Sequence, residues 1–334
     1  MMAQPITQPL LVGVDVGGTK IAAGLVTSCG EIKSHIRTPM VANHGAAEGL
    51  AAVVSGIELL FAQDASARSR IGGIGICAPG PLDPNTGVVI NPPNLPCWRD
   101  FQLAAAIQKT YGVPVKIEND ANAAALAEAH WGAGRGYRHI FYTSFGTGIG
   151  SAIIFDGRIY NGRTGSAPEA GHMSVDYRGP LCGCGKPGCI EVLAAGPAIA
   201  RRARAKLAEG KASSKILDAA HGDIEAVTSE MVGQAYAAND PLAKEVLEET
   251  VDLLSLWLSN VVDLLEPDAV VIGGGVAAML SPFFAELHAG MVKYSINSRN
   301  HEVPFLKAHY GEGAGIAGGA ALCLQFPAPV PASS

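Results

Sequence analysis

Two stretches of the chain combine apolar strands and glycine turns in the same order. The first, from Leu10 to Val26, predicts a strand, a glycine turn and a second strand, and is followed by a turn at Ser28 to Gly30 and a third strand. The second, from His139 to Phe155, repeats this plan and is followed by a turn at Asp156-Gly157. The repetition predicts two domains that each open with a small antiparallel sheet.

The rest of the chain alternates between helical and strand patterns, which is typical of an α/β protein. We expect a domain boundary near Asn119, so that residues 1–119 form one domain and 120–314 the other. The small-residue helix at about 315–326 is expected to pack back on the first domain. The main expected elements are helices at 49–62, 103–111, 121–130 and 247–265, and strands at 71–77, 113–117 and 269–272.

Composition narrows the class of protein and of ligand. The 334 residues include 41 glycines and only 16% charged residues, which predicts many tight turns and close backbone approaches. The net charge of -6 argues against nucleic acid and against an anionic membrane as partners. The N-terminus lacks signal-peptide features and no long apolar span is evident, so a cytoplasmic protein is expected.

Three of the seven cysteines fall within eight residues, and a histidine precedes them. His172, Cys182, Cys184 and Cys189 lie in segments rich in glycine and proline. One imidazole and three thiolates suit a closed tetrahedral site, which predicts a structural Zn²⁺. The zinc would fix the neighbouring carboxylates of Glu169 and Glu191, in a way that suits hydrogen bonding to hydroxyl groups.

The two glycine turns are candidate phosphate sites. In the first, Asp15 precedes the turn, where backbone amides can approach phosphate oxygens and the carboxylate could hold Mg²⁺; the turn comprises Gly17, Gly18, Thr19 and Lys20. The alternative for this turn alone is an ordinary hairpin. The second turn, with Gly146, Thr147 and Gly148, repeats the chemistry. A third glycine segment, with Gly274 and Gly275, directly follows a buried-looking strand, and its backbone could lie flat against the adenosine of a nucleotide. The alternative for this segment is a strand-to-helix turn that requires positive φ.

Asp120 follows a strand and precedes an alanine-rich helix, so Asn119 and Asp120 are expected at the carboxyl edge of a sheet, where α/β ligand sites form. A carboxylate in that place can take a proton from an attacking hydroxyl during phosphoryl transfer. The alternative is that Asp120 is only the N-cap of the helix.

Over nearly its whole length the sequence resembles the ROK family of sugar kinases and repressors, within the hexokinase, Hsp70 and actin superfamily. The resemblance is carried by the two glycine turns, by Glu118-Asn119-Asp120-Ala121-Asn122, and by Glu169-Ala170-Gly171-His172 with the cysteine segment through Glu191. It implies a two-domain actin-like, ribonuclease H-like ATPase fold with an interdomain cleft. One departure is Pro168, which stands where the family usually has glycine.

The resemblance also implies the roles of individual residues. Asp120 would be the catalytic base, and His172 would bind both zinc and sugar. The remaining sugar-binding residues implied by the family are Gly80, Asn94, Asn119, Glu169 and Glu191. The segments 78–81 and 93–98 are most similar to glucokinase members, so glucose is the first choice among hexoses; N-acetylglucosamine, N-acetylmannosamine and fructose stay open.

The expected ligands are therefore ATP, Mg²⁺, a structural Zn²⁺ and a sugar, and the family implies a homodimer or homotetramer. Two rivals from another class remain, a sugar-responsive transcriptional regulator and a catalytically inactive sugar-binding regulator. The early position of Asp15 and the acidic charge speak against a DNA-binding regulator. Asp120 and both glycine turns speak against the inactive one.

Overall fold

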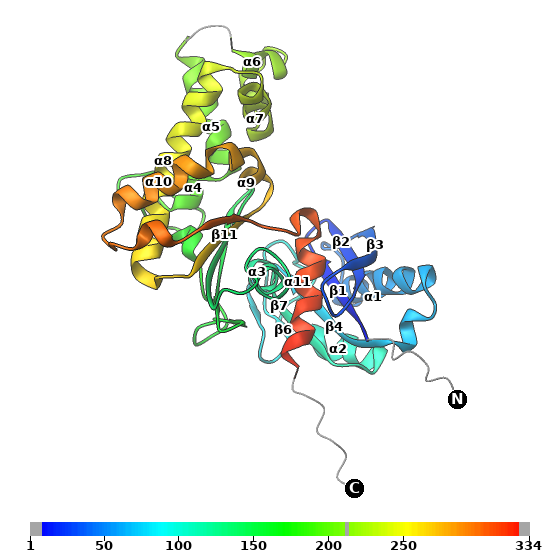
Figure 1. Cartoon of the computed structure of the whole chain (residues 1–334). Coiled ribbons are helices and arrows are strands. Elements are labelled where there is room, and N and C mark those ends of the chain that lie inside the picture. Colours follow the sequence, from blue (N-terminus) through cyan, green and yellow to red (C-terminus); the bar gives the residue numbers. More distant parts are fainter. Residues whose placement is uncertain (1–8, 211–213, 327–334) are drawn as a thin grey trace. The chain divides into compact units, whose positions relative to one another are not determined.

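The computed structural model describes residues 9–210 and 214–326 and divides into two compact units (Figure 1). The first unit comprises residues 1–136, 153–168 and 312–334, and the second comprises residues 137–152 and 169–311. The sequence places the boundary near Asn119, whereas the helix that starts at Asp120 belongs to the first unit. The reason is long-range packing, since this helix contacts the C-terminal helix of the same unit.

The first unit is built on a five-stranded sheet of order β3-β2-β1-β4-β7. Strand β2 is antiparallel to both β1 and β3, whereas β4 and β7 run parallel to β1. The strands are β1 Leu10–Val16, β2 Lys20–Val26, β3 Ile32–Pro39, β4 Ile71–Ala78 and β7 Val115–Asn119, with a small hairpin of β5 Leu82–Asp83 and β6 Val88–Val89. The helices are α1 Ala46–Gln63, α2 Leu103–Tyr111, α3 Asp120–His130 and α11 Ala314–Leu322.

The second sheet has the order β10-β9-β8-β11-β12, which is the same plan of three hairpin strands followed by two parallel ones. This agreement confirms the duplicated architecture. Its strands are β8 His139–Phe145, β9 Ile149–Phe155, β10 Arg158–Ile159, β11 Ala269–Gly273 and β12 Phe305–Lys307. The helices are α4 Ile190–Ala194, α5 Gly196–Ala208, α6 Lys215–Ala219, α7 Ser229–Ala237, α8 Pro241–Leu265, α9 Gly275–Leu280 and α10 Phe284–Tyr294.

Alternation along the strands sorts the first sheet into two faces. Even-numbered residues of β1, such as Val12 and Val14, join the large core that includes Val53 and Ile57 of α1. The odd-numbered residues Leu11 and Gly13 face α11 instead. One face of the sheet therefore packs into an apolar core with α1, and the other face packs against α11.

Helix α11 lies beside the first sheet (Figure 1), and its backbone closely approaches the backbone of β1 and β4. A Cβ added at Gly13 would lie 1.8 Å from the carbonyl oxygen of Ile316, and one added at Gly75 would lie 1.8 Å from that of Gly319. Gly318 makes the same close approach to the backbone of Ala123 in α3. Glycine at these positions is what lets β1, β4, α3 and α11 pack as one block.

The second unit has its own aromatic centre. Trp257 of α8 is buried and packs edge-on against Phe141 and Phe145 of β8, with ring centroids 5.7 and 6.3 Å apart. Its indole N–H donates to the carbonyl oxygen of Ala170 at 3.0 Å. The long helix is thus fixed both to the sheet and to the segment that carries His172.

The sequence predicts no long apolar span, but two helical stretches, Ala46–Gln63 and Gly275–Tyr294, are long and apolar enough to cross a membrane by length and composition. Core helices meet the same criterion, so the match is weak evidence. Helix α1 buries Val53, Ile57 and Leu60, and the second stretch is divided into α9, a 3₁₀ turn and α10.

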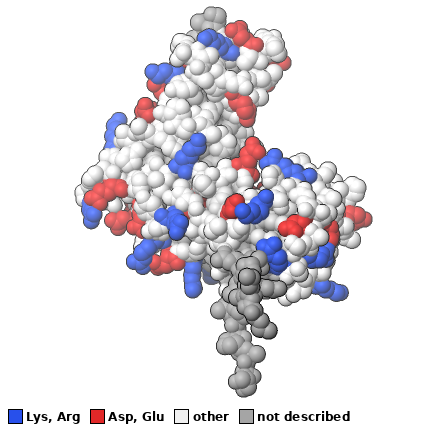
Figure 2. All heavy atoms as spheres, turned by 45° about the vertical axis from the view of Figure 1, so that its right-hand side comes forward, with Lys and Arg blue, Asp and Glu red and all other residues white. Residues whose placement is uncertain are grey.

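On the face drawn in Figure 2, basic and acidic side chains are interspersed among uncharged ones.

We expect Gly75→Ala to lower the free energy of unfolding by about 3 kcal/mol or more, because the new methyl group collides with the backbone of α11. Urea denaturation followed by circular dichroism measures this. Gly112→Ala is the control: its glycine has a φ of +70° and open space around it, so only about 1 kcal/mol of backbone strain is expected. Equal losses in the two variants would contradict the packing argument.

Candidate active site

The first glycine turn joins β1 to β2. Its backbone closes through the N–H of Gly17, which donates to the carbonyl oxygen of Lys20 at 2.9 Å. Gly18 packs against Asn94, whose carbonyl oxygen would lie 2.7 Å from an added Cβ. The structure therefore brings two of the predicted segments, the first turn and the Asn94 segment, into direct contact. Thr19 and Lys20 are exposed at the end of the turn.

Asp15 lies one residue before the end of β1, on the face that meets α11. Gly315 lies so close to Asp15 that an added Cβ would be 2.5 Å from the carboxyl carbon. The thiol of Cys77, on the neighbouring strand β4, lies 3.7 Å from Asp15 Oδ1. Burial raises the pKa of Asp15, and the negative charge of Asp120 raises it further.

Asp120 is the first residue of α3, and the N-cap is its neighbour Asn119. Asn119 Oδ1 accepts hydrogen bonds from the backbone N–H of Ala121 and Asn122, at 2.9 and 3.4 Å. The alternative in which Asp120 serves only as the cap is thereby weakened, because Asn119 performs that function. The Asp120 side chain is accessible to solvent and accepts from Ala121 N–H at 2.8 Å.

The environment of Asp120 favours its neutral form. The surrounding protein atoms strip the carboxylate of hydration and raise its pKa, although hydrogen bonds from Ala121 and Asn119 partly offset this. A carboxylate with a raised pKa is a better proton acceptor at neutral pH than an ordinary aspartate. The pair of Asp15 and Asp120 also repel each other, and a divalent cation would relieve that repulsion.

The second glycine turn joins β8 to β9 and is held by Glu191. Glu191 Oε2 accepts from the backbone N–H of Ile149 at 3.0 Å. Gly148 leaves room for this contact, because an added Cβ would lie 2.5 Å from the same oxygen. The other oxygen, Oε1, lies 3.8 Å from Nδ1 of His172. One carboxylate therefore connects the turn to the histidine of the cysteine cluster.

The four predicted metal ligands form a tight cluster. Their ligand atoms all lie within 4.8 Å of one another. Cys182 Sγ is 3.6 Å from His172 Nδ1, and Cys184 Sγ is 3.6 Å from Cys189 Sγ. A zinc ion with Zn–S bonds of about 2.3 Å requires S–S edges of about 3.8 Å, so these residues fit a tetrahedral ion. All seven cysteines are free of disulfides.

The segment from Glu169 to His172 packs directly on β9. Gly171 would place an added Cβ 2.0 Å from the carbonyl oxygen of Ile149, and the N–H of Ala170 donates to Ser151 Oγ at 2.9 Å. The carboxylate of Glu169 is exposed. Close backbone packing therefore orients this segment, and glycine at 171 is a steric requirement.

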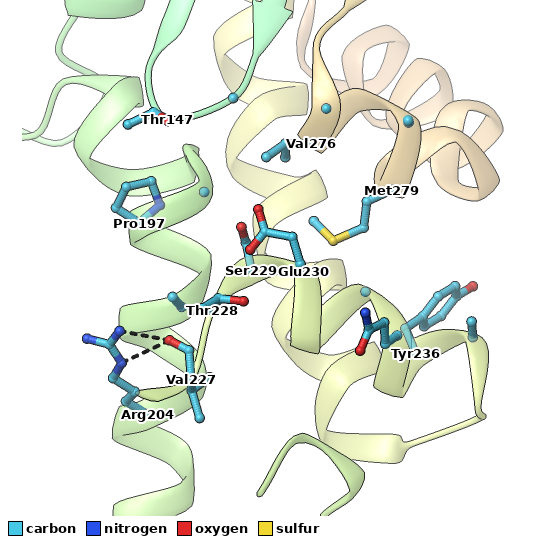
Figure 3. Close-up of a pocket in the computed structure, with 18 of the residues that line it drawn as sticks. Thr147, Pro197, Arg204, Val227, Thr228, Ser229, Glu230, Tyr236, Val276 and Met279 are labelled. Atoms are coloured by element: carbon cyan, nitrogen blue, oxygen red, sulfur yellow. Dashed lines mark hydrogen bonds between the residues drawn. The ribbon is translucent and has the colours of Figure 1, made fainter. Parts of the chain in front are cut away.

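A cavity of about 990 Å³ opens beside the second turn (Figure 3). It lies among α5, α7 and α9, and Figure 3 shows Ser229 and Glu230 projecting between Pro197 on one side and Met279 on the other. Arg204 borders it and is fixed by hydrogen bonds to the carbonyl oxygen of Val227. Its size lies at the upper end of the range for small-molecule sites.

The cavity includes some predicted nucleotide residues and not others. Gly146, Thr147 and Gly275 line it. Gly148 and Gly274 do not; Gly274, at a φ of +92°, instead lets the chain turn against the backbone of Phe145. Sequence reasoning missed Gly196-Pro197 and the Thr228 to Tyr236 segment. The available signal was proline in the first turn of a helix and threonine as an N-cap.

The predicted sugar residues are distributed over both units. Asn94, Asn119 and Asp120 belong to the first, and Glu169, His172 and Glu191 belong to the second. Gly80 lies two residues beyond the end of β4, and the nearest atom to an added Cβ is Leu82 N at 3.9 Å. Glu118, to which the sequence pattern assigns no role, is buried on β7 directly before Asn119.

Three relatives illustrate what this chain is similar to. A glucokinase of Halalkalibacterium halodurans is 34% identical over 316 residues, covering 94% of both chains. The structure of a ROK family glucokinase from Streptomyces griseus in complex with glucose and AMPPNP matches with a TM-score of 0.79 and 32% identity, covering 95% of this chain and 100% of that one. A ROK family transcriptional regulator, a homolog of the E. coli MLC protein, has a TM-score of 0.82 and 26% identity, covering 95% of this chain and 78% of the regulator.

Two sheets of identical plan, each opened by a hairpin with a glycine turn, define the class: this is the actin-like ATPase fold shared by sugar kinases. The ROK family profile matches residues 11–326. The chain belongs to the ROK family.

We expect Gly148→Ala to lower the free energy of unfolding by about 1 to 3 kcal/mol, because the methyl group displaces Glu191 from the Ile149 N–H. Thermal denaturation measures the effect. Gly146→Ala is the matched control in the same turn, since an added Cβ there meets no atom within 4 Å. If both variants unfold like the parent protein, Glu191 does not hold the turn.

Proposed function

We propose that this chain is an ATP-dependent glucokinase that transfers the γ-phosphoryl group of Mg·ATP to the 6-hydroxyl of glucose. The observation that carries the proposal is the accessible Asp120 carboxylate, with a raised pKa and Asp15 nearby, in a chain that matches a glucokinase over 94% of its length. Asp120 accepts the proton of the attacking hydroxyl. Since this proton transfer requires the ionised carboxylate, turnover depends on Asp120 being deprotonated.

The nucleotide is assigned to elements of each unit. The first unit supplies the amides of the turn Gly17 to Lys20 for phosphate oxygens and Asp15 for Mg²⁺, which neutralises charge on the transferred group. The second unit supplies the turn Gly146 to Gly148 and the cavity beside it for the adenosine. The N–H of Gly196, at the start of α5, donates to the carbonyl oxygen of Gly146 at 2.9 Å. This helix end adds positive potential next to the turn.

The sugar is assigned to Gly80, Asn94, Asn119 and Asp120 of the first unit and Glu169, His172 and Glu191 of the second. For His172 the geometry supports a double role. Its Nδ1 faces the thiols, so Nε2 is the nitrogen that could hydrogen-bond to a hydroxyl group. N-acetylglucosamine, N-acetylmannosamine and fructose are the competing substrates, and kcat/KM over a panel of hexoses ranks them.

The second candidate function is a sugar-responsive regulator, which the structural likeness to a ROK transcriptional regulator favours. This chain covers 78% of that regulator, whereas it covers 94% of the glucokinase relative and 100% of the glucokinase structure.

We also infer a cytoplasmic location, because a reducing compartment keeps the free thiols of the cluster available for a metal. A homodimer or homotetramer is expected from the family alone.

We expect Asp120→Asn to lower kcat for glucose by at least about a hundredfold, because the amide cannot accept the proton. Glucose affinity, measured by titration calorimetry, and the unfolding temperature are expected to stay close to those of the parent. Asp218→Asn, which changes an exposed aspartate of α6, is the control and keeps full activity. A kcat near the parent value in Asp120→Asn would remove Asp120 from the mechanism.

We expect the purified protein to contain one zinc ion per chain, held by His172 and the three clustered cysteines. Cys184→Ser should lose the metal by elemental analysis and bind glucose more weakly, because the segments that carry Glu169 and Glu191 loosen. Cys29→Ser, at an exposed cysteine of the first unit, is expected to keep both properties. Unchanged glucose affinity in a zinc-free protein would refute the structural role.

A further inference from the structure

Glu118 is a buried carboxylate that the mechanism above does not use. It lies on β7 directly before Asn119, and its exposed fraction is 3%. Among the described residues no cation lies within ion-pair distance of it; Lys116, two residues earlier, acts on it only through its more distant charge. A buried charge is costly unless its hydrogen-bonding capacity is filled, so its partners show why it is retained.

Three amide groups donate to this carboxylate. Oε1 accepts from the backbone N–H of Asn119 at 2.8 Å and from Nδ2 of Asn122 at 3.1 Å. Oε2 accepts from Nδ2 of Asn161 at 2.9 Å. Asn122 also donates to Asn161 Oδ1 at 3.2 Å, so the three side chains form a closed network.

Each donor belongs to a segment with a role in the proposed reaction. Asn119 and Asn122 flank Asp120 at the start of α3. Asn161 begins the loop 161–168, which closes through the Ala167 N–H donating to the Asn161 carbonyl oxygen at 3.2 Å and leads directly into Glu169. Glu118 is thus the point at which the backbone that carries Asp120 is attached to the loop that precedes a sugar-binding residue.

Because amide groups donate to both Oε1 and Oε2, both terminal atoms of the side chain at position 118 must be hydrogen-bond acceptors. A carboxylate meets this requirement, whereas glutamine of the same size offers one oxygen and one NH₂ group. Glutamine at 118 would direct its NH₂ group at the NH₂ group of Asn161 or lose the contacts at Oε1. The chemistry of the site therefore selects glutamate over its neutral isostere.

We propose that Glu118 is a positioning residue for phosphoryl transfer: by attaching the Asn119-Asp120 backbone to the loop 161–168, it holds the base at the distance from the sugar that proton transfer requires. The inference rests on the proposed sugar-kinase function. Glu118, Asn119, Asp120 and the loop 161–168 all belong to the first unit.

The test exchanges donor and acceptor across one hydrogen bond. Glu118→Gln alone, and Asn161→Asp alone, each place two like groups against each other. The double variant E118Q/N161D restores the pairing, because the glutamine NH₂ group donates to the aspartate while its oxygen still accepts from Asn119 and Asn122. If kcat recovers in the double variant, the hydrogen bond between residues 118 and 161 is what the reaction needs, and not the charge of residue 118.

We expect kcat for glucose to fall about ten- to hundredfold in each single variant, with KM for ATP within about twofold, and to recover to within about threefold in the double variant. Glu128→Gln is the matched control. Glu128, on α3, is likewise a buried carboxylate, with an exposed fraction of 1%, and it accepts from the N–H of Ala133 beyond the far end of the helix. Its substitution is expected to lower the unfolding temperature without the loss in kcat.

Amide hydrogen exchange gives a readout that does not depend on turnover. Glu118→Gln is expected to speed exchange at residues 119–122 and across 161–167 together, and the double variant to reverse this. A parent protein without sugar-kinase activity would refute the proposed function, while coupled exchange would still show that Glu118 joins the two segments. Normal kcat in folded Glu118→Gln, or no rescue in the double variant, would overturn the positioning role.

Discussion

The direct contact of α11 with the first sheet is the constraint on which the geometry of Asp15 and Asp120 depends. Because Gly13, Gly75 and Gly319 carry no side chains, the helix approaches the strands backbone to backbone. Gly315 then lies against the Asp15 carboxylate, and Gly318 fits against the backbone of α3, whose first residue is Asp120. Two carboxylates that are 105 positions apart in the sequence are thus placed by the same helix.

That placement has an electrostatic cost that a structural role would not explain. Burial and the charge of Asp120 raise the pKa of Asp15, and desolvation by the surrounding protein atoms raises that of Asp120, although its side chain is accessible. The folded protein thus holds two carboxyl groups under conditions that oppose their charge. Groups shifted in this direction cluster at functional sites. Burial raises the pKa of Glu118 as well, and what distinguishes this carboxylate is that three amide groups donate to its two oxygens.

The sequence predicted the features that are local or repeated. The two hairpins with glycine turns, the strand before Asp120 and the close spacing of the three cysteines are legible within about twenty residues, and the structure contains each of them. The boundary at Asn119 differs from the observed units because α3 packs on α11, nearly two hundred residues away. The cavity escaped notice for the same reason, since it is assembled from four separate segments. The pairing around Glu118 joins residues 43 positions apart, and only the fold shows that its acceptor pattern is filled.

The two sheets share a strand order but differ in the residue that precedes the glycine turn. Asp15, the penultimate residue of β1, pairs in register with Cys77 of β4. The penultimate residue of β8 is Ser144, which pairs with Gly273 of β11. A carboxylate therefore precedes the first turn and a neutral hydroxyl precedes the second. The second unit places its carboxylate elsewhere, on Glu191, where it binds the turn to the segment of the metal cluster. The two units therefore differ in how a carboxylate meets the turn: Asp15 precedes the first turn within its strand, whereas Glu191 accepts the Ile149 N–H at the end of the second.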